Sequence, residues 1–264
     1  MVKGINTKLA YIVLPLSLVF GYLMYTYVLG NPANFENGDP NGEPLKGNIL
    51  GTIYKGGLLV IPLLSFQFIS LVYIIERYLS LRLSRGKGDL RTFVQKVKDA
   101  LAADDYEKIV QLSDQQRGAV GSVVRTGMEV FLRRKAASQV DQKDVYLIQK
   151  ELEETTQLEV SELTTNMFIL GTVAQISTLI GLLGTVTGMI QAFAALARVG
   201  EPDPVGLAGG ISQALVTTAL GITVAAFTIV FYNSFNNQIE RITYTIDEVC
   251  FSIIHSLKIK FFVD

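Results

Sequence analysis

Gly181-Leu182-Leu183-Gly184-Thr185-Val186-Thr187-Gly188 lies within a long uncharged run of the chain. No charged side chain occurs between residues 163 and 197, and none occurs between residues 204 and 239. A helix needs about 20 apolar residues to cross a bilayer, so both runs are long enough. Both are also richer in glycine and hydroxyl side chains than a plain lipid anchor requires. They therefore predict two long membrane helices that pack closely against protein.

The composition of the whole chain agrees with a membrane protein. Its 264 residues are 49% hydrophobic and 18% charged, with a mean hydropathy of +0.36. Two further apolar stretches, residues 9–29 and 56–75, predict two more spans. A cleaved signal peptide is the alternative for the first stretch, but bulky Tyr25 and Tyr27 stand where a small-residue cleavage site belongs. We expect this stretch to remain as a helix.

The distribution of basic residues predicts the orientation. Arginines and lysines follow the second span closely, whereas residues 30–55 and 198–208 carry few. By the positive-inside rule, residues 80–165 and both termini are expected in the cytoplasm, and residues 30–55 and 198–208 outside it. The expected regions are residues 1–80 with two spans (about 9–29 and 56–78), a cytoplasmic helical region 81–160, two long spans within 161–238, and a cytoplasmic helix 239–264.

The polar segments carry local signals of their own. Residues 31–48 are rich in turn-forming residues and predict a loop. Asp89 is a candidate N-cap, and Gln115-Gln116-Arg117-Gly118 predicts a break between helices. A charged helix beginning near Asp141 is expected to continue without interruption into the third span.

Apolar residues recur every three or four positions after the fourth span. They are Ile239, Ile242, Ile246, Val249 and Ile253. This amphipathic face suits either helices of a partner or a neighbouring helix of the same chain. The pattern alone leaves both alternatives open.

Polar residues form stripes along the last two spans. In the third span Thr172, Gln175, Thr178 and Thr185 recur at helical spacing, and in the fourth Gln213, Thr217, Gly221 and Thr228 do so, with Thr218 alongside. Polar groups are costly against lipid, so the stripes should face protein or a water-filled passage. The candidates for lining such a passage are Thr185, Thr218, Thr178, Gln175, Gln213 and Thr217. The candidates for close helix packing are Gly181, Gly184, Gly188 and Gly221.

Several kinds of chemistry are not expected. The single Cys250 excludes an internal disulfide, and no cluster of His, Cys, Asp or Glu has metal-ligand spacing. No nucleophile–base pair or phosphate-binding loop is evident, so we expect no enzyme, no metal and no cofactor. A net charge of −1 gives no general attraction to nucleic acid. None of the four apolar stretches contains Asp, Glu, Lys, Arg or His, so a proton carrier would have to come from another subunit.

Two motifs carry a resemblance to a known family. The stretches 181–189 (GLLGTVTGM) and 209–222 (GGISQALVTTALGI) resemble the ExbB/TolQ/MotA proton-channel family, nearest its ExbB branch. The resemblance implies an all-α, multi-pass membrane protein whose long helices extend into the cytoplasm and which assembles as a ring, a homopentamer. It implies a single-span ExbD- or TolR-like partner that supplies a membrane aspartate, and a TonB-like protein that transmits force to outer-membrane transport. Thr185 and Thr218 would line the passage.

The chain also departs from the family pattern. Gln213 stands where members usually carry Glu, Thr178 replaces a usual Pro, and Thr187 replaces a common Trp. The first span, residues 9–29, is additional to the common three-span plan. A TolQ-like role in envelope integrity, a MotA-like motility stator and a non-conducting membrane scaffold remain as alternative functions.

Overall fold

The computed structural model describes residues 6–40, 42–137, 140–197 and 203–262, and shows a helical protein. By length and composition, four helical stretches can cross a membrane: Tyr11–Leu29, Gly57–Ser84, Gln142–Leu196 and Pro204–Phe261. The chain divides into two compact units. We call residues 1–75 with 166–232 the apolar unit, and residues 76–165 with 233–264 the polar unit. The expected all-α membrane fold is therefore confirmed.

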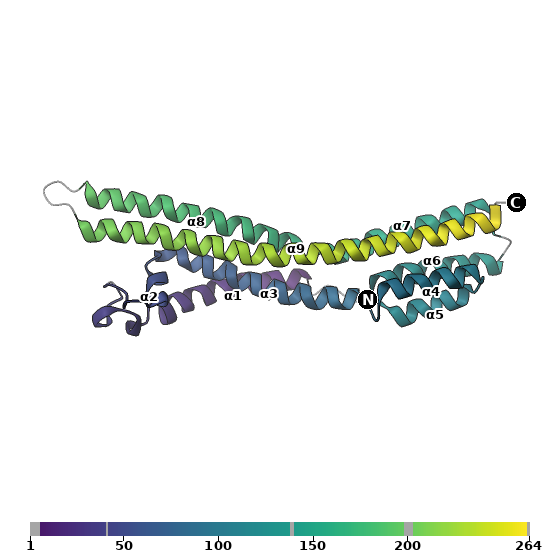
Figure 1. The fold of residues 1–264 in the computed structure, drawn as a ribbon, viewed down its shortest axis with the longest axis horizontal. Helices are drawn as coiled ribbons and strands as arrows, with labels where there is room; N and C mark the ends of the chain where they lie inside the picture. The colour runs from purple at the N-terminus through teal and green to yellow at the C-terminus, as the bar shows by residue number, and fades with distance from the viewer. Residues whose placement is uncertain (1–5, 41, 138–139, 198–202, 263–264) are drawn as a thin grey trace. The chain divides into compact units, whose positions relative to one another are not determined.

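The apolar unit contains α1 (Asn6–Leu23), most of α3 (Val60–Ser84), α8 (Met167–Leu196) and the first half of α9 (Pro204–Phe262). A π-helical segment, Met24–Leu29, continues α1. α1 lies on α3, where the rings of Phe20 and Phe68 stack with centroids 4.6 Å apart. α8 and the first half of α9 run side by side (Figure 1).

The polar segment between the first two spans forms an ordered loop with short helical turns at Pro32–Asn34, Glu36–Gly38, Ile49–Tyr54 (α2) and Gly57–Leu59. The Asn34 side chain is buried, and its Nδ2 donates to the carbonyls of Val28 and Leu29 at 2.8 and 3.0 Å. Asn48 Nδ2 donates in turn to Asn34 Oδ1. The loop prediction is confirmed, and these asparagines hold the loop against the end of the preceding π-helix.

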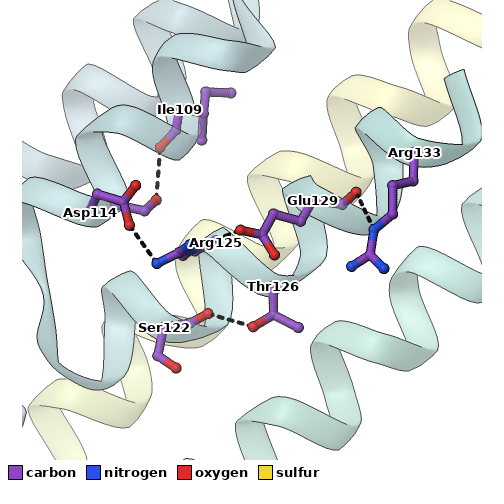
Figure 2. Close-up of polar contacts among 8 residues, drawn as sticks. Ile109, Asp114, Ser122, Arg125, Thr126, Glu129 and Arg133 are labelled. Carbon is purple, nitrogen blue, oxygen red and sulfur yellow. Dashed lines mark hydrogen bonds and ion pairs between the residues drawn. The ribbon is translucent and has the colours of Figure 1, made fainter. Parts of the chain in front are cut away.

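The polar unit contains α4 (Leu90–Ala102), α5 (Tyr106–Gln116), α6 (Gly118–Ala137) and α7 (Gln142–Thr164), together with the end of α9. Asp89 caps α4 by accepting the Thr92 N–H, as predicted. Arg117 and Gly118 separate α5 from α6 with φ of 56° and 67°, which confirms the predicted break. In Figure 2 Arg125 of α6 lies between Asp114 of α5 and Glu129 of α6, so an ion-pair network covers this hairpin.

The second half of α9 packs within its own chain. Ile239, Ile242, Ile246, Val249 and Ile253 are all at most 5% exposed. Lys98 of α4 pairs with Glu248 at 2.6 Å, and the Phe131 ring of α6 contacts Phe261. Of the two alternatives for this face, the structure supports the neighbouring helices of the same chain.

The prediction of one unbroken helix from Asp141 into the third span is wrong. α7 ends at Thr164, and α8 begins at Met167. Asn166 between them has a left-handed conformation with φ of 62°, which asparagine tolerates better than most residues. Arg77 Nη1 donates to the Leu163 carbonyl in the last turn of α7, at 3.4 Å. α9, in contrast, is one continuous helix, as predicted.

Candidate functional site

The contact between α8 and α9 is made of small residues. Gly181, Gly184 and Gly188 lie on the buried face of α8. A Cβ added to Gly188 would lie 2.6 Å from the Gly210 carbonyl oxygen, and one added to Gly221 would lie 2.7 Å from the Ser177 carbonyl oxygen. The two backbones therefore approach so closely that any larger side chain would collide with the facing helix. The structure places all four candidate packing glycines in this contact.

Thr217 lies inside this contact. It is 0% exposed, and its side chain occupies the space that a Cβ on Gly184 would need. Its Oγ1 lies within hydrogen-bond distance of the carbonyls of Gln213 and Ala214, at 2.8 and 3.1 Å. Thr217 thus fills the helix contact in the single chain. Ser177 of α8, which the sequence analysis did not single out, is equally buried, four residues before Gly181 in the same small-residue spacing.

Thr218 lies beside Thr217 at the edge of the contact. Its Oγ1 reaches the Gly181 carbonyl of α8 at 3.1 Å and the Ala214 carbonyl of its own helix at 3.0 Å. The side chain remains partly exposed. A hydroxyl that donates to backbone oxygens still has lone pairs, so Thr218 can accept a hydrogen bond from water or from a protonated acid.

Thr178 and Thr185 lie along one edge of α8. Thr185 Oγ1 donates to the Leu182 carbonyl at 2.6 Å, and Thr178 Oγ1 lies 3.2 Å from the Ala174 carbonyl. At about 100° per residue, both project from the same edge of the α8 contact face. In an antiparallel pair this edge adjoins the side of α9 that carries Thr218. Gln175, which is exposed, lies further around the same side of α8.

Gln213 points elsewhere. The atoms of its carboxamide group are the nearest neighbours of Gly57, 3.4–3.5 Å from the position of an added Cβ. Gly57 has a φ of +72°, a conformation that other residues rarely adopt. Gln213 therefore faces the turn that leads into α3. The hydroxyls of Thr178, Thr185 and Thr218 share one edge, whereas Thr217 and Gln213 do not lie on it.

A buried pair of hydroxyls joins α3 to α9. Ser70 Oγ and Thr228 Oγ1 are 2.7 Å apart, and both residues are 0% exposed. Thr228 donates its proton to the Val224 carbonyl, so Ser70 is the donor within the pair. Thr228 belongs to the polar stripe of the sequence, but its role here is a bond between helices. No signal in the sequence pointed to Ser70.

The hairpin has no acidic or basic side chain of its own. Residues 167–196 and 204–239 contain no Asp, Glu, Lys, Arg or His. In the described part of the chain no group of three metal-ligating side chains comes together. The hairpin therefore offers hydroxyls and shape along one edge, without a side chain that can change its charge at neutral pH.

Comparison with known proteins agrees with this geometry. A profile of the MotA/TolQ/ExbB proton channel family matches residues 118–248. The Tol-Pal system protein TolQ of Haemophilus influenzae is 29% identical over 189 residues, which cover 70% of this chain and 81% of that protein. A putative biopolymer transport protein, ExbB-like 3 of Synechocystis sp., is 30% identical over 185 residues, which cover 69% of this chain and 82% of that protein. This chain belongs to the MotA/TolQ/ExbB proton channel family, a family of membrane channel proteins rather than of enzymes.

Proposed function

We propose that this protein forms the wall of a proton channel in a motor complex of the bacterial inner membrane, with both of its termini in the cytoplasm. The observation that carries the proposal is the edge bearing Thr178, Thr185 and Thr218, in a hairpin that has no Asp, Glu, Lys, Arg or His. Each hydroxyl donates to a backbone carbonyl and keeps lone pairs free to accept. The edge can thus solvate a proton carrier but cannot be one.

The proton carrier is a membrane aspartate of a single-span, ExbD- or TolR-like partner. Several copies of the chain, five by resemblance to the family, surround this partner with their hydroxyl edges turned inward. Hydrogen bonds between membrane helices are worth about 0.6–2 kcal/mol each, whereas a polar side chain against lipid gains nothing. Gln175 is exposed in the single chain, so a ring would give its amide a polar environment.

We propose the ExbB branch, in which a TonB-like protein carries the force to outer-membrane transport. A relative named as an ExbB-like transport protein supports this branch, while one named as TolQ of the Tol-Pal system supports a role in envelope integrity. Deletion of the gene separates these two branches and a third, a motility stator. Loss of iron or haem uptake identifies the ExbB branch, detergent sensitivity identifies the TolQ branch, and loss of motility identifies a MotA-like stator.

The channel itself is tested by proton flux into vesicles that contain the protein and its single-span partner. Thr218→Val removes the hydroxyl and keeps the shape, and we expect it to abolish partner-dependent flux while the complex still assembles. Thr223→Val is the matched control, because Thr223 is exposed, bonds only to the Ala219 carbonyl and lies on another side of α9. Full flux from the Thr218 variant, or flux without any acidic partner, would overturn the proposal. Absence of partner-dependent flux from the wild-type complex would also overturn it and would favour a non-conducting scaffold.

A further inference from the structure

Five cationic residues lie in or next to the turns that join α3 to α4 and α5 to α6. Arg82 is in the last turn of α3, Arg85 and Lys87 follow it, Arg91 is in the first turn of α4, and Arg117 joins α5 to α6. We call these five residues the basic patch. Arg117 is separated from Lys87 by about thirty positions in the sequence, so the patch depends on the fold as well as on local composition.

Close backbone contacts bring the two segments together. Lys87 N–H donates to the Gln116 carbonyl at 2.6 Å. A Cβ added to Gly86 would lie 2.5 Å from the Arg117 carbonyl oxygen, and one added to Gly118 would lie 2.6 Å from the Gly86 nitrogen. Both glycines have positive φ, so this approach requires residues without a side chain. The turn that holds Arg117 is thereby fixed against the segment that holds Arg85 and Lys87.

The cations of the basic patch lack acidic partners. Within the described residues, no carboxylate lies at ion-pair distance from any of the five. Some other cations of the polar unit are paired: Lys98 with Glu248, Arg125 with Asp114, and Lys260 with Asp104. Asp89 is the nearest acidic residue in sequence, but it accepts hydrogen bonds from the backbone and hydroxyl of Thr92. The patch therefore keeps an excess of positive charge, because one carboxylate stands near five cations.

An apolar surface on α3 precedes the basic patch. Tyr78, Leu79 and Leu83 are 55, 52 and 62% exposed. The stretch that can cross a membrane by length and composition ends at Ser84, among these residues. Exposed apolar side chains followed within one or two turns by cations are typical of the boundary between acyl chains and headgroups.

We propose that the basic patch binds the phosphate headgroups of anionic phospholipids, of the phosphatidylglycerol or cardiolipin class. Guanidinium groups contact phosphate oxygens through paired N–H donors, and the patch offers four arginines. The lysine adds a point charge, while Tyr78, Leu79 and Leu83 contact the start of the acyl chains. This proposal rests on the chain lying in a membrane and is independent of proton conduction.

The test uses the full-length protein in bilayer discs made of phosphatidylglycerol and phosphatidylcholine. Mass spectrometry of the released complexes measures how strongly each lipid is retained. We expect wild-type protein to retain phosphatidylglycerol preferentially. Arg85→Gln/Lys87→Gln/Arg117→Gln should reduce that preference by roughly tenfold or more, since it removes three cations that attract the anionic headgroups.

The matched control is Lys108→Gln/Arg133→Gln/Lys143→Gln, which removes the same charge from exposed positions outside the basic patch. This variant should keep the wild-type preference, and the conservative Arg85→Lys/Arg117→Lys variant should keep most of it. Equal loss in the control would show a general charge effect and overturn the proposal. So would a wild type that retains both lipids equally, or inorganic phosphate at millimolar concentration that displaces the lipid completely.

Discussion

The two units of this protein are both helical, but their helices pack through opposite kinds of residues. In the apolar unit α8 and α9 meet through glycines and buried hydroxyls, with Thr217 against Gly184. In the polar unit the buried positions are large, and Phe131, Ile148 and Ile246 are all 0% exposed. Close approach of the two backbones stabilises the contact in the apolar unit. Removal of apolar area from water stabilises the contacts in the polar unit.

The surrounding solvent explains this difference. Lipid tails are as apolar as leucine, so membrane helices gain little from burying large side chains against each other. They gain from close packing and hydrogen bonds, which small residues and hydroxyls provide. In water the burial of apolar area dominates at about 25 cal/mol per Å², so bulky side chains are favoured. The same chain uses both rules along α9, and substitutions should separate them.

The largest expected effect comes from adding volume to the glycine contact. In Gly184→Leu the new side chain meets the Thr217 side chain, and neither backbone has room to retreat. We expect α8 and α9 to lose their contact and the protein to be lost from the membrane fraction or to aggregate in detergent. Size-exclusion chromatography after solubilisation measures this loss. Gly209→Leu is the control, since nothing lies within 4 Å of its added Cβ, and similar loss from both variants would contradict the contact.

A smaller effect is expected from removing volume in the polar unit. Ile246 is 0% exposed, so Ile246→Ala leaves a cavity and should cost about 2–5 kcal/mol of unfolding free energy. Ile222→Ala is the control in the apolar unit, where Ile222 is 56% exposed. Chemical denaturation in detergent should show destabilisation in the first variant and little change in the second. Equal destabilisation would mean that burial in water does not distinguish the two halves of α9.

Local signals allowed much of this fold to be predicted. Uncharged length predicted the four spans, and the cap at Asp89 and the break at Arg117-Gly118 follow from backbone preferences of single residues. The break at Asn166 was missed, because a single left-handed residue leaves no periodic pattern in the sequence where the charged helix gives way to the uncharged one. Asparagine after two threonines was the only available signal.

The residue types of the candidate site could be predicted from the sequence. The side of the helix on which each residue lies could not. Thr217 and Thr218 are adjacent and chemically identical, and about 100° of helix rotation puts one inside the contact and the other at its edge. Which one is buried depends on where Gly181 and Gly184 of the facing helix lie. The direction in which the Gln213 side chain points depends in the same way on the position of the turn at Gly57. Which residue is buried is decided by how two helices pack against each other, and the spacing of residues along the sequence does not specify that packing.

The smallest expected effect concerns pH, and it should reach only the polar unit. A hydrogen bond from Lys260, followed by one from Tyr106, lowers the pKa of Asp104 below its ordinary value. A carboxyl whose pKa is lower in the folded state contributes its full stabilisation of the fold at pH values above its unfolded pKa of about 3.9. This contribution disappears as pH falls through the lowered pKa of the folded state. The same contact raises the pKa of Lys260, so its contribution is present at neutral pH and disappears only as pH rises through that raised pKa.

Hydrogen exchange along α9 measures this effect. As pH falls from 6 to well below the unfolded pKa of about 3.9, after correction for intrinsic exchange, protection should fall in the last turns around Lys260. It should remain unchanged around Thr217, because residues 204–239 contain no Asp, Glu or His. Asp104→Asn removes the ion pair and should give the low protection already at pH 6. If protection around Lys260 stayed high at low pH, the end of α9 would be held by Phe131 and its apolar neighbours alone. The polar unit would then follow the packing rule of water without help from its charges.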